Sequence, residues 1–455
     1  MSRIAWSLAG GLTTQQIQSL HEQALDVLAT IGLDISHEPT LRILAEHDGV
    51  TIRGARAHFA ADVVNRCTLK RPYTPPADTA LTAGAGVYCL NVMDYDGTIR
   101  PATTGDAVRM VKLADALDFS GETPVEPQDI PPRLRQVAMT KICWENSRRL
   151  SGGYLYDPEP AEFVYEMAQA AGRTFALGGT VIISPLKVDP AKLDLFLRFR
   201  DRGVRVNFSA MPMVGATAPI FFPAAIVQAL AEFLGGVVLS CLVFGGDPSP
   251  GIINLYPYDL RHNTVSFGSA EKLLLMLSAM QIANYFGFDI GPNALMGTAR
   301  APDAQAGAEK LSQVMVTALA GARHFRYAGS LSQDEIFSPV QLVIDREIVD
   351  FVARVLRGYD VGPQEQFLDI IAQGVADGGF LAHPATLEHF RDTYWFPPLF
   401  DHQSLGAWRE AGQPSVADRA RAIAEKKLAD HQFALPAEVA RDLNNIYRRA
   451  QQQLT

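Results

Sequence analysis

Apolar runs of strand length alternate with amphipathic stretches along the middle of the chain, and this alternation predicts the fold. Strands that alternate with helices form βαβ units, and their strands make a parallel sheet. We count eight such runs: Thr123 to Glu126, Arg149 to Tyr156, Thr180 to Ser184, Val204 to Ala210, Val237 to Gly245, Ile252 to Tyr258, Phe288 to Asn293 and Phe325 to Gly329.

Helical patterns separate most of these runs, although only the loop Gly246 to Gly251 joins the fifth to the sixth. The patterns cover Pro131 to Asn146, Pro160 to Ala171, Pro190 to Arg202, Pro219 to Leu234, Ala270 to Phe286, Ala304 to Ala320 and Pro339 to Leu356. A doubly wound sheet would usually carry a glycine-rich phosphate turn after its first strand, which this sequence lacks. We therefore expect an α/β fold, a (β/α)8 TIM barrel of about 250 residues, over residues 119–357.

The two flanks differ from this central rhythm. Thr13 and Gln16 resemble a capping box that opens an amphipathic helix, and Gly32 ends it. Short strand and helix patterns follow, so we expect an α/β cap region over residues 1–118. Residues 358–455 are helical and polar, with long helices expected at Ala417 to Asp430 and Pro436 to Gln453. We expect this C-terminal extension to pack on the barrel.

The composition is that of a folded protein without a nucleic-acid partner. Apolar residues make up 48% and charged residues 20% of the chain, close to the globular average. The 40 basic and 49 acidic residues give a net charge of -9, and no run of lysines and arginines is longer than a pair. Such a chain has little to neutralise a phosphate backbone.

Three further patterns bear on the compartment. The N-terminal apolar stretch Ile4 to Leu12 is interrupted by glycines and makes a poor secretory signal. From Val206 to Gly246 the only charge is Glu232, and about 20 apolar residues can span a membrane. Prolines and glycines divide that stretch, so we expect buried strands and a helix instead. The cysteines have no metal or redox spacing: Cys67, Cys89, Cys143 and Cys241. We expect a cytoplasmic protein with no membrane span.

In a barrel, reacting groups lie at the carboxyl ends of the strands. Those positions hold many aromatic residues and no histidine, which is unusual for proton transfer or metal ligation. Aromatic faces hold a diffuse cation such as a quaternary ammonium. We expect a cage from these rings, although each alone could be barrel core: Tyr156, Phe208, Phe244, Tyr256 and Tyr327.

Other candidates at the strand ends remain open. Lys187 could form a Schiff base, or it could be a solvated loop lysine. Asp259 with His262, or Glu126 with Asp129, could contribute to a metal site, but neither pair belongs to a recognisable ligand motif. Solvated loop charges explain these pairs equally simply.

Several soft motifs in one order along the whole chain resemble the trimethylamine methyltransferase family. The resemblance is to its branch without pyrrolysine, typified by glycine betaine methyltransferase. The motifs are Tyr95 to Arg100 with Thr104-Gly-Asp106, Val214 to Pro219, Asp303 to Lys310, Ala328 to Ser330 with Gln341 to Glu347, and Phe380 to Pro398.

The resemblance implies a barrel enzyme that moves a methyl group from a quaternary amine, such as glycine betaine, to Co(I). That cobalt belongs to a corrinoid (cobalamin) on a separate, transient partner protein, so no tightly bound cofactor of this chain is expected. The sequence has no pyrrolysine, which makes trimethylamine an unexpected substrate. A quaternary ammonium releases a neutral amine and needs no acid, which agrees with the lack of a catalytic acid, base or metal motif. We also expect a homo-oligomer.

A betaine carries a carboxylate, which would be costly to bury without a donor. His383 and Asn293 are the candidates, with Asn207 behind them. His383 lies in a proline-flanked segment that we expect to close over the barrel mouth, although it could equally anchor its own loop. Two other classes stay open: a lyase or aldolase that uses Lys187 or a metal, and a betaine-binding protein without catalysis.

Overall fold

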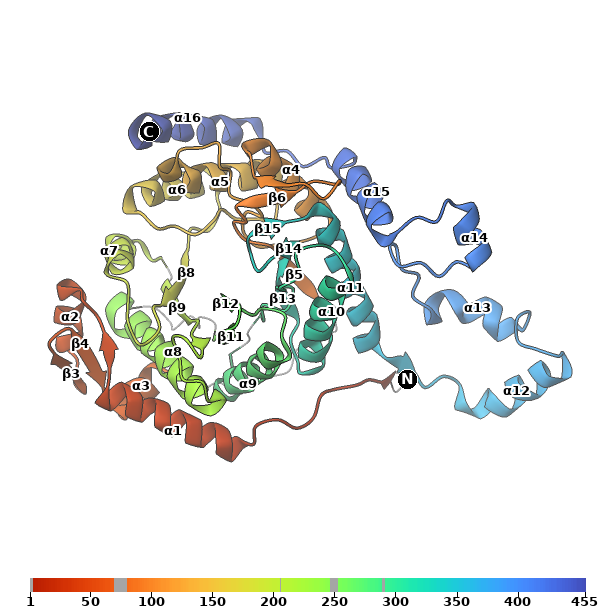
Figure 1. The fold of residues 1–455 in the computed structure, drawn as a ribbon, viewed down its shortest axis with the longest axis horizontal. Coiled ribbons are helices and arrows are strands. Elements are labelled where there is room, and N and C mark those ends of the chain that lie inside the picture. The colour runs from red at the N-terminus through yellow and green to blue at the C-terminus, as the bar shows by residue number, and fades with distance from the viewer. Residues whose placement is uncertain (1–2, 69–79, 205, 246–252, 289–290) are drawn as a thin grey trace.

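The structure is a computed structural model and describes residues 3–68, 80–204, 206–245, 253–288 and 291–455. It is a mixed α/β fold in which helices surround short central strands (Figure 1). The helices are α1 (Thr14–Thr30), α2 (Glu38–Ala45), α3 (Ala61–Cys67), α4 (Thr104–Ala116), α5 (Pro132–Asn146), α6 (Pro158–Ala171), α7 (Pro190–Phe199), α8 (Phe222–Phe244), α9 (Ala270–Phe286), α10 (Ala304–Leu319), α11 (Pro339–Arg357), α12 (Phe367–Ala376), α13 (Pro384–Thr393), α14 (Leu405–Glu410), α15 (Val416–Ala429) and α16 (Ala437–Leu454).

The strands are short and form sheets of two to four members. They are β1 (Arg3–Ile4), β2 (Leu33–Asp34), β3 (Val50–Arg53), β4 (Arg56–Phe59), β5 (Thr82–Ala85), β6 (Asn91–Met93), β7 (Ile99–Pro101), β8 (Leu177–Ile182), β9 (Val206–Ala210), β10 (Met213–Val214), β11 (Tyr256–Asp259), β12 (Thr264–Val265), β13 (His324–Ala328), β14 (Ser330–Leu331), β15 (Ile336–Phe337) and β16 (Tyr359–Asp360).

Parallel pairings link the central segments in sequence. β13 pairs with β5, and β8 pairs with β9. Single bridges extend both pairs, because Gly84 pairs with Ser120, Gly121 with Leu150, and Ala210 with Ile253. The Arg326 amide donates to the Pro292 carbonyl at 3.1 Å, which brings the segment before α10 beside β13. Because the strand pairs and bridges within each group are parallel, the carboxyl ends of the segments in a group lie on one side.

The expected fifth strand, Val237 to Gly245, is wrong: these residues complete α8 and enter the turn after it. The helix is buried on nearly every face, so its apolar residues show no helical period. It lies against α1 and β9 so closely that a Cβ on Gly236 would stand 2.5 Å from the Phe208 Cβ. Within the described ranges, α8 is the one helix long and apolar enough to cross a membrane, and 83% of its most apolar window is buried.

The C-terminal residues divide into a packed part and a projecting part. α15 lies against α4 and α11, and α16 lies against α5 and α6, as expected. Residues 362–394, which hold α12 and α13, instead project from the ring of helices (Figure 1). Most of their side chains are exposed, so the expectation that the whole extension packs on the barrel is wrong for this part. We refer to residues 362–394 as the arm.

Candidate functional site

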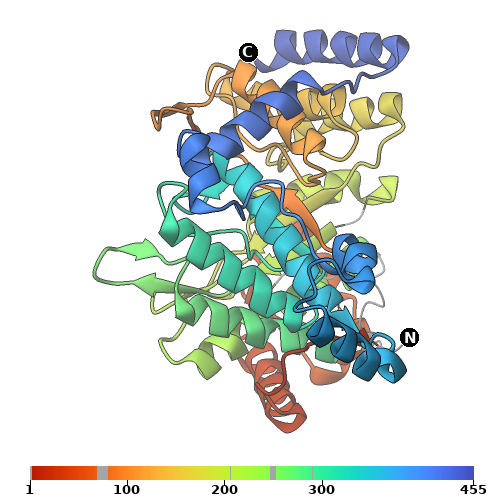
Figure 2. The ribbon, with the colours of Figure 1, turned by 90° about the vertical axis from the view of Figure 1, so that its right-hand side faces the viewer.

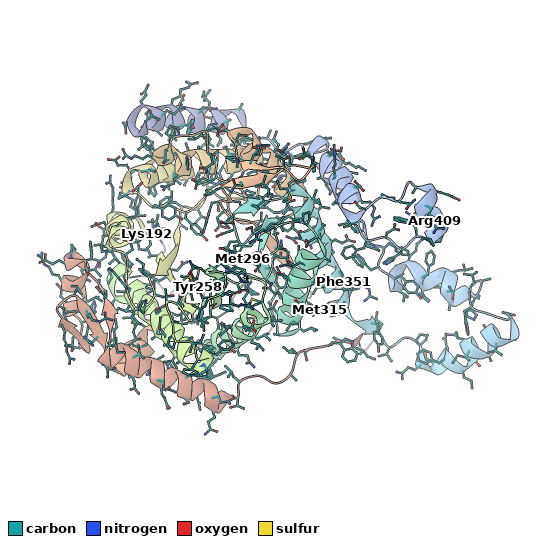
Figure 3. The ribbon with its side chains drawn as sticks, viewed as in Figure 1. Lys192, Tyr258, Met296, Met315, Phe351 and Arg409 are labelled. Carbon is teal, nitrogen blue, oxygen red and sulfur yellow. The ribbon has the colours of Figure 1, made fainter. Side chains whose placement is uncertain are left out.

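Four tyrosines gather at the carboxyl ends of the central segments, and we refer to Tyr88, Tyr154, Tyr256 and Tyr327 as the tyrosine cluster. The rings of Tyr88 and Tyr154 pack edge to face with centroids 5.4 Å apart. Tyr256 and Tyr327 share a small apolar cluster with Phe267 and Met296. Figure 3 places Met296 near the centre of the ring of helices. The chain thus brings several aromatic faces to one place.

The phenols of the cluster are held in their neutral form. Burial raises the pKa of all four tyrosines. For Tyr327, the neighbouring Tyr154 and Tyr256 raise the pKa further. Neutral rings present the negative face of their π system, which is the surface that attracts a cation.

Two of these tyrosines sit in the left-handed region of backbone space, which side chains other than glycine rarely adopt. Their φ angles are 44° at Tyr88 and 75° at Tyr327. The Tyr88 amide donates to the Thr123 carbonyl at 2.9 Å, and the Ser330 hydroxyl donates to the Tyr327 carbonyl at 2.7 Å. Strain of this kind costs about 1–3 kcal/mol and clusters at functional sites. It is a second reason to place the site here.

A buried ion pair fixes the turn that follows Tyr327. Asp345 in α11 accepts from Lys310 Nζ and from the Gly329 amide, each at 2.7 Å. Lys310 also donates to the Ser330 carbonyl at 2.8 Å, and neither charged side chain is exposed. Burial lowers the lysine pKa and raises the carboxyl pKa, while each partner opposes the shift of the other. The lysine and the carboxylate bond to each other and to the backbone of the turn. The backbone beside Tyr327 is therefore held rigidly.

Glu122 and Arg326 bring opposite charges to the cluster without pairing. Both side chains are half-buried, and across the described residues neither forms a hydrogen bond or an ion pair. After burial, Glu122 is the main influence that raises the Tyr154 pKa, whereas Arg326 lowers it. Burial raises the pKa of Glu122 itself, and Arg326 opposes that shift. Glu122 and Arg326 thus act in opposite directions on the same tyrosine, and among the described residues neither side chain has an ion-pair partner.

Asp334 and Asn293 complete the polar lining. Burial raises the Asp334 pKa, and its carboxylate in turn raises the pKa of Tyr88 and Tyr256, both already raised by burial. Asn293 Nδ2 donates to the Tyr256 hydroxyl at 2.6 Å. The Asn293 Oδ1 atom is buried and finds no partner among the residues that the structure describes.

Lys272 supports the cluster from behind. It is 1% exposed, and its Nζ donates to the Asn293 carbonyl at 2.7 Å and to Gln313 Oε1 at 2.6 Å. Burial lowers its pKa to about 7. Its Nζ lies 5.8 Å and 5.9 Å from the ring centroids of Tyr256 and Phe267. We interpret Lys272 as a brace for the Asn293 segment, because acceptors already occupy its amine.

The structure brings together three of the sequence-predicted residues, Tyr256, Asn293 and Tyr327. Phe208 and Phe244 lie elsewhere, since both pack on Phe196 of α7 with centroids 5.6 Å and 5.8 Å away. They fill the space between β9 and helices α7 and α8. Phe244 lies at the end of the helix α8, and not at the end of a strand as expected.

Of the remaining candidates, Tyr156 adjoins the cluster, because it adds to the rise in pKa that burial gives Tyr88 and Tyr154. Tyr156 is half-exposed, and Lys192 Nζ already covers its ring at 3.9 Å. Asn207 lies within β9. Lys187 is exposed at a backbone bridge to Asp34.

His383 caps α13 in the arm, where it accepts from the Ala385 amide at 3.1 Å and pairs with Gln373 at 3.2 Å. The expectation that it closes over a barrel mouth is therefore wrong. The alternative role as a loop anchor fits these contacts.

The paired charges that could have held a metal have other partners. Asp259 binds Arg261 and His262, and Glu126 binds Arg135 at 2.8 Å. Asp129 accepts from the Thr104 amide at 2.9 Å. In the part of the chain that the structure describes, no group of three or more histidine, cysteine, aspartate or glutamate side chains could hold a metal ion.

The sequence did not single out Tyr88, Glu122 or Arg326. Tyr88 lies in the region interpreted as a cap, and Glu122 directly precedes the first expected strand. Tyr154 stands near the end of an expected strand, two residues before Tyr156, but was not chosen for the cage. A charged residue inside an otherwise apolar run, as Arg326 is in β13, was the available signal.

Comparisons with known proteins place the whole chain among methyltransferases. The model of the trimethylamine methyltransferase family matches residues 8–454. A glycine betaine methyltransferase of Desulfitobacterium hafniense is 25% identical over 92% of each chain. A proline betaine:corrinoid methyltransferase of Eubacterium limosum is 25% identical over 96% of each chain. A trimethylamine methyltransferase of Methanosarcina mazei is 30% identical over 96% of this chain and 94% of the relative.

Proposed function

Because the chain belongs to the trimethylamine methyltransferase family, we propose that it transfers a methyl group from a betaine to a corrinoid protein. The observation that carries the choice of a betaine is the set of unpaired charges around neutral rings. The tyrosine cluster offers faces for a quaternary ammonium, and Glu122 adds a negative charge beside them. Arg326 offers a positive charge that a simple tetraalkylammonium would leave unused.

A zwitterion satisfies both charges at once. Half-buried charges without partners are costly, and a ligand that pairs with them recovers that cost. The ammonium end fits the rings and Glu122, and the carboxylate end fits the forked donors of Arg326. Asn293 enters the proposal as the group that orients the Tyr256 hydroxyl. His383 does not enter it, because its ring nitrogens are engaged within the arm.

The reaction needs alignment more than acid or base. The C–N bond breaks, its electron pair stays on nitrogen, and the amine leaves neutral while the methyl group bonds to cobalt. The Co(I) of the partner's corrinoid supplies the nucleophile. The part of this chain is to hold the methyl group in line, at a separation of about 3–3.5 Å from the attacking atom. We propose that the partner docks transiently where the tyrosine cluster faces outward, in the cytoplasm.

We further propose that the central segments form an eight-stranded (β/α)8 barrel. β5 takes the place of the mistaken fifth strand, because it pairs in parallel with β13 and bridges to Ser120. The other members would be the segments near residues 120, 150, 253 and 292, with β8, β9 and β13. In this arrangement the barrel begins at β5, before the expected boundary at residue 119. The tyrosine cluster then stands at the carboxyl-terminal mouth, where barrel enzymes place their sites.

The test is to incubate the purified protein with reduced cob(I)alamin and with glycine betaine, proline betaine or tetramethylammonium. Methylcobalamin, followed by its absorbance, should form with a betaine and much more slowly with tetramethylammonium. Betaine binding without methylcobalamin, also in the presence of a corrinoid protein, would point to a silent binding protein. Trapping of Lys187 by borohydride with a carbonyl substrate would point to a lyase.

A further inference from the structure

The arm is an ordered helical hairpin and yet carries exposed apolar side chains. Gly374 is buried because the Phe380 ring lies on it, and a Cβ there would stand 2.1 Å from that ring. The contact between His383 and Gln373 ties α12 to the start of α13. Figure 3 labels Arg409 in the neighbouring α14, far from Met296 at the centre. The hairpin holds its shape outside the main body.

One face of α12 is an unpartnered apolar stripe. Phe367, Leu368, Ile371 and Val375 follow helical spacing and therefore share one side of the helix. Their exposed fractions are 42%, 77%, 54% and 72%. Leu381, in the turn after the helix, is 90% exposed. Exposed patches of this extent mark interaction surfaces.

The N-terminal segment continues this surface at the base of the arm. β1 pairs with β16, so Arg3 lies opposite Asp360 and Ile4 opposite Tyr359. The two views agree that the N-terminus lies beside the start of the arm (Figures 1 and 2). Trp6 and Leu8 are 62% and 47% exposed. The apolar surface thus includes residues from both ends of the chain.

We propose that this surface is the interface between two copies of this chain, each of which contributes its arm and its N-terminal segment. A stable interface buries about 800 Å² on each partner. An aromatic side chain can bury about 150–250 Å², so the aromatic and aliphatic side chains exposed here together can supply an area of that order. They are Ile4, Trp6, Leu8, Tyr359, Phe367, Leu368, Ile371, Val375, Phe380, Leu381, Leu387 and Tyr394.

A second copy fits this surface better than the corrinoid protein does. A methyl carrier must leave in every turnover, and transient partners use smaller and more polar interfaces. The arm also extends away from the ring of helices whose centre holds Met296 (Figure 3), so a protein seated on it would not face the tyrosine cluster. A two-fold axis, by contrast, places each apolar stripe against its own counterpart. This inference does not depend on the reaction.

The experiment compares the mass of three proteins by size exclusion with light scattering. Leu368→Glu combined with Leu381→Glu should reduce the mass to that of one chain, 49.6 kDa. The wild type and a control, Leu274→Glu in α9, should have at least twice that mass. Leu274 is a suitable control because it is a helical leucine, 58% exposed, outside the surface.

A wild type of single-chain mass, or a double variant that keeps the wild-type mass, would overturn the proposal. Hydrogen exchange of the wild type gives a test without substitutions, because amides of residues 367–376 should lose protection on dilution. Protection that appears only when a corrinoid protein is added would assign the surface to that partner and also overturn the proposal.

Discussion

At the scale of one residue, Arg326 tests the proposed choice of substrate, because it acts on Tyr154 and Tyr256 and has no ion-pair partner among the described residues. Arg326→Gln should raise the KM for glycine betaine by about 10- to 100-fold, because it removes a charge-assisted hydrogen bond that contributes about 1.5–3 kcal/mol. Binding of tetramethylammonium, which has no carboxylate, should change little. Steady-state kinetics and calorimetric titration of both compounds measure the difference.

Two further variants control this prediction. Arg326→Lys keeps the charge but loses the fork, so it should restore part of the affinity. Arg323→Gln removes bonds to the Ala318 and Ala322 carbonyls and should not change the ratio between the two compounds. If Arg326→Gln weakened both compounds equally, Arg326 would not read the carboxylate.

Glu122 should make cation binding depend on pH. Burial raises its pKa above the ordinary value of 4.5, and only the ionised form attracts an ammonium. The affinity for tetramethylammonium should therefore be present above the raised pKa and be lost as pH falls through it. Calorimetric titration between about pH 4.5 and 8 would show this, and Glu122→Gln should flatten the profile. A variant profile equal to that of the wild type would assign the titration to another group, and Asp334→Asn would test the nearest one.

The same shift has a consequence for stability without ligand. A raised pKa means that the folded protein holds the Glu122 proton more tightly than the unfolded chain does, so stability falls as pH rises above 4.5. Glu122→Gln should therefore raise the melting temperature at pH 7.5 and leave it unchanged at pH 4. Thermal denaturation at the two pH values gives this readout independently of binding.

Substitutions of Tyr154 and Phe208 should distinguish a ring that binds the cation from a ring that only packs in the core. Tyr154→Ala should weaken cation binding by about 0.5–2 kcal/mol, and Tyr154→Phe should retain most of the affinity. Phe208, 1% exposed, should behave differently, because its alanine variant creates a cavity that costs about 3–5 kcal/mol of stability. Titration with tetramethylammonium and chemical denaturation of all three variants distinguish the roles. Equal affinity of Tyr154→Ala and the wild type would remove Tyr154 from the site.

Some residues of the candidate site were selected from the sequence, and others were missed. Tyr256, Tyr327 and Asn293 were accessible, since each stands at the end of an apolar run. Phe208 could not be told from a cage residue, because the side of the strand that faces the helices and the side that faces the centre are both apolar. Arg326 was missed because only its neighbours in space, Glu122 and Tyr154, give it a role.

At the scale of elements, the residues that begin and end a helix or strand decided which elements could be predicted. The helix expected at Ala270 to Phe286 is found there as α9, because Ser269 caps its start and Gly287 ends it. α8 was divided wrongly, since a helix buried all round lacks a period and its glycines suggested a break. β5 was missed because Thr82-Ala-Gly-Ala85 is short and lacks the β-branched and aromatic run typical of strands.

The glycines that suggested a break in α8 allow the helix to pack closely against its neighbours. Gly236→Ala should lower the free energy of unfolding by about 1–3 kcal/mol, because the new methyl meets Phe208 in a filled core. The matched control is Gly307→Ala in α10, where a Cβ meets nothing within 4 Å. That change should raise stability by about 0.5–1 kcal/mol. Urea denaturation measures both, and a stabilised Gly236→Ala would show that α8 can move away from β9.

At the scale of the whole molecule, the sequence does not indicate whether an apolar segment is covered by its own chain or by another protein. The aromatic residues from Phe380 to Phe400 indicated burial, and the barrel was the obvious partner. In the structure, Leu399 and Phe400 do bind Glu347 of α11 through their amides, whereas most side chains of the arm just before them are exposed. The composition predicts that the apolar surface must be covered, but a second copy of the chain can cover it as well as the same chain can.

α8 also matters before the protein has folded. As it leaves the ribosome, this 23-residue apolar segment has the length that membrane-insertion machinery accepts. Glu232 lies near its middle, and an acidic side chain at that depth opposes insertion by about 2.5–3.5 kcal/mol. In the folded chain the same carboxylate accepts from the Ser184 hydroxyl at 2.7 Å and the Leu186 amide at 3.0 Å. One buried glutamate thus fastens the helix to its neighbour and also makes insertion of the newly made segment into a bilayer less favourable.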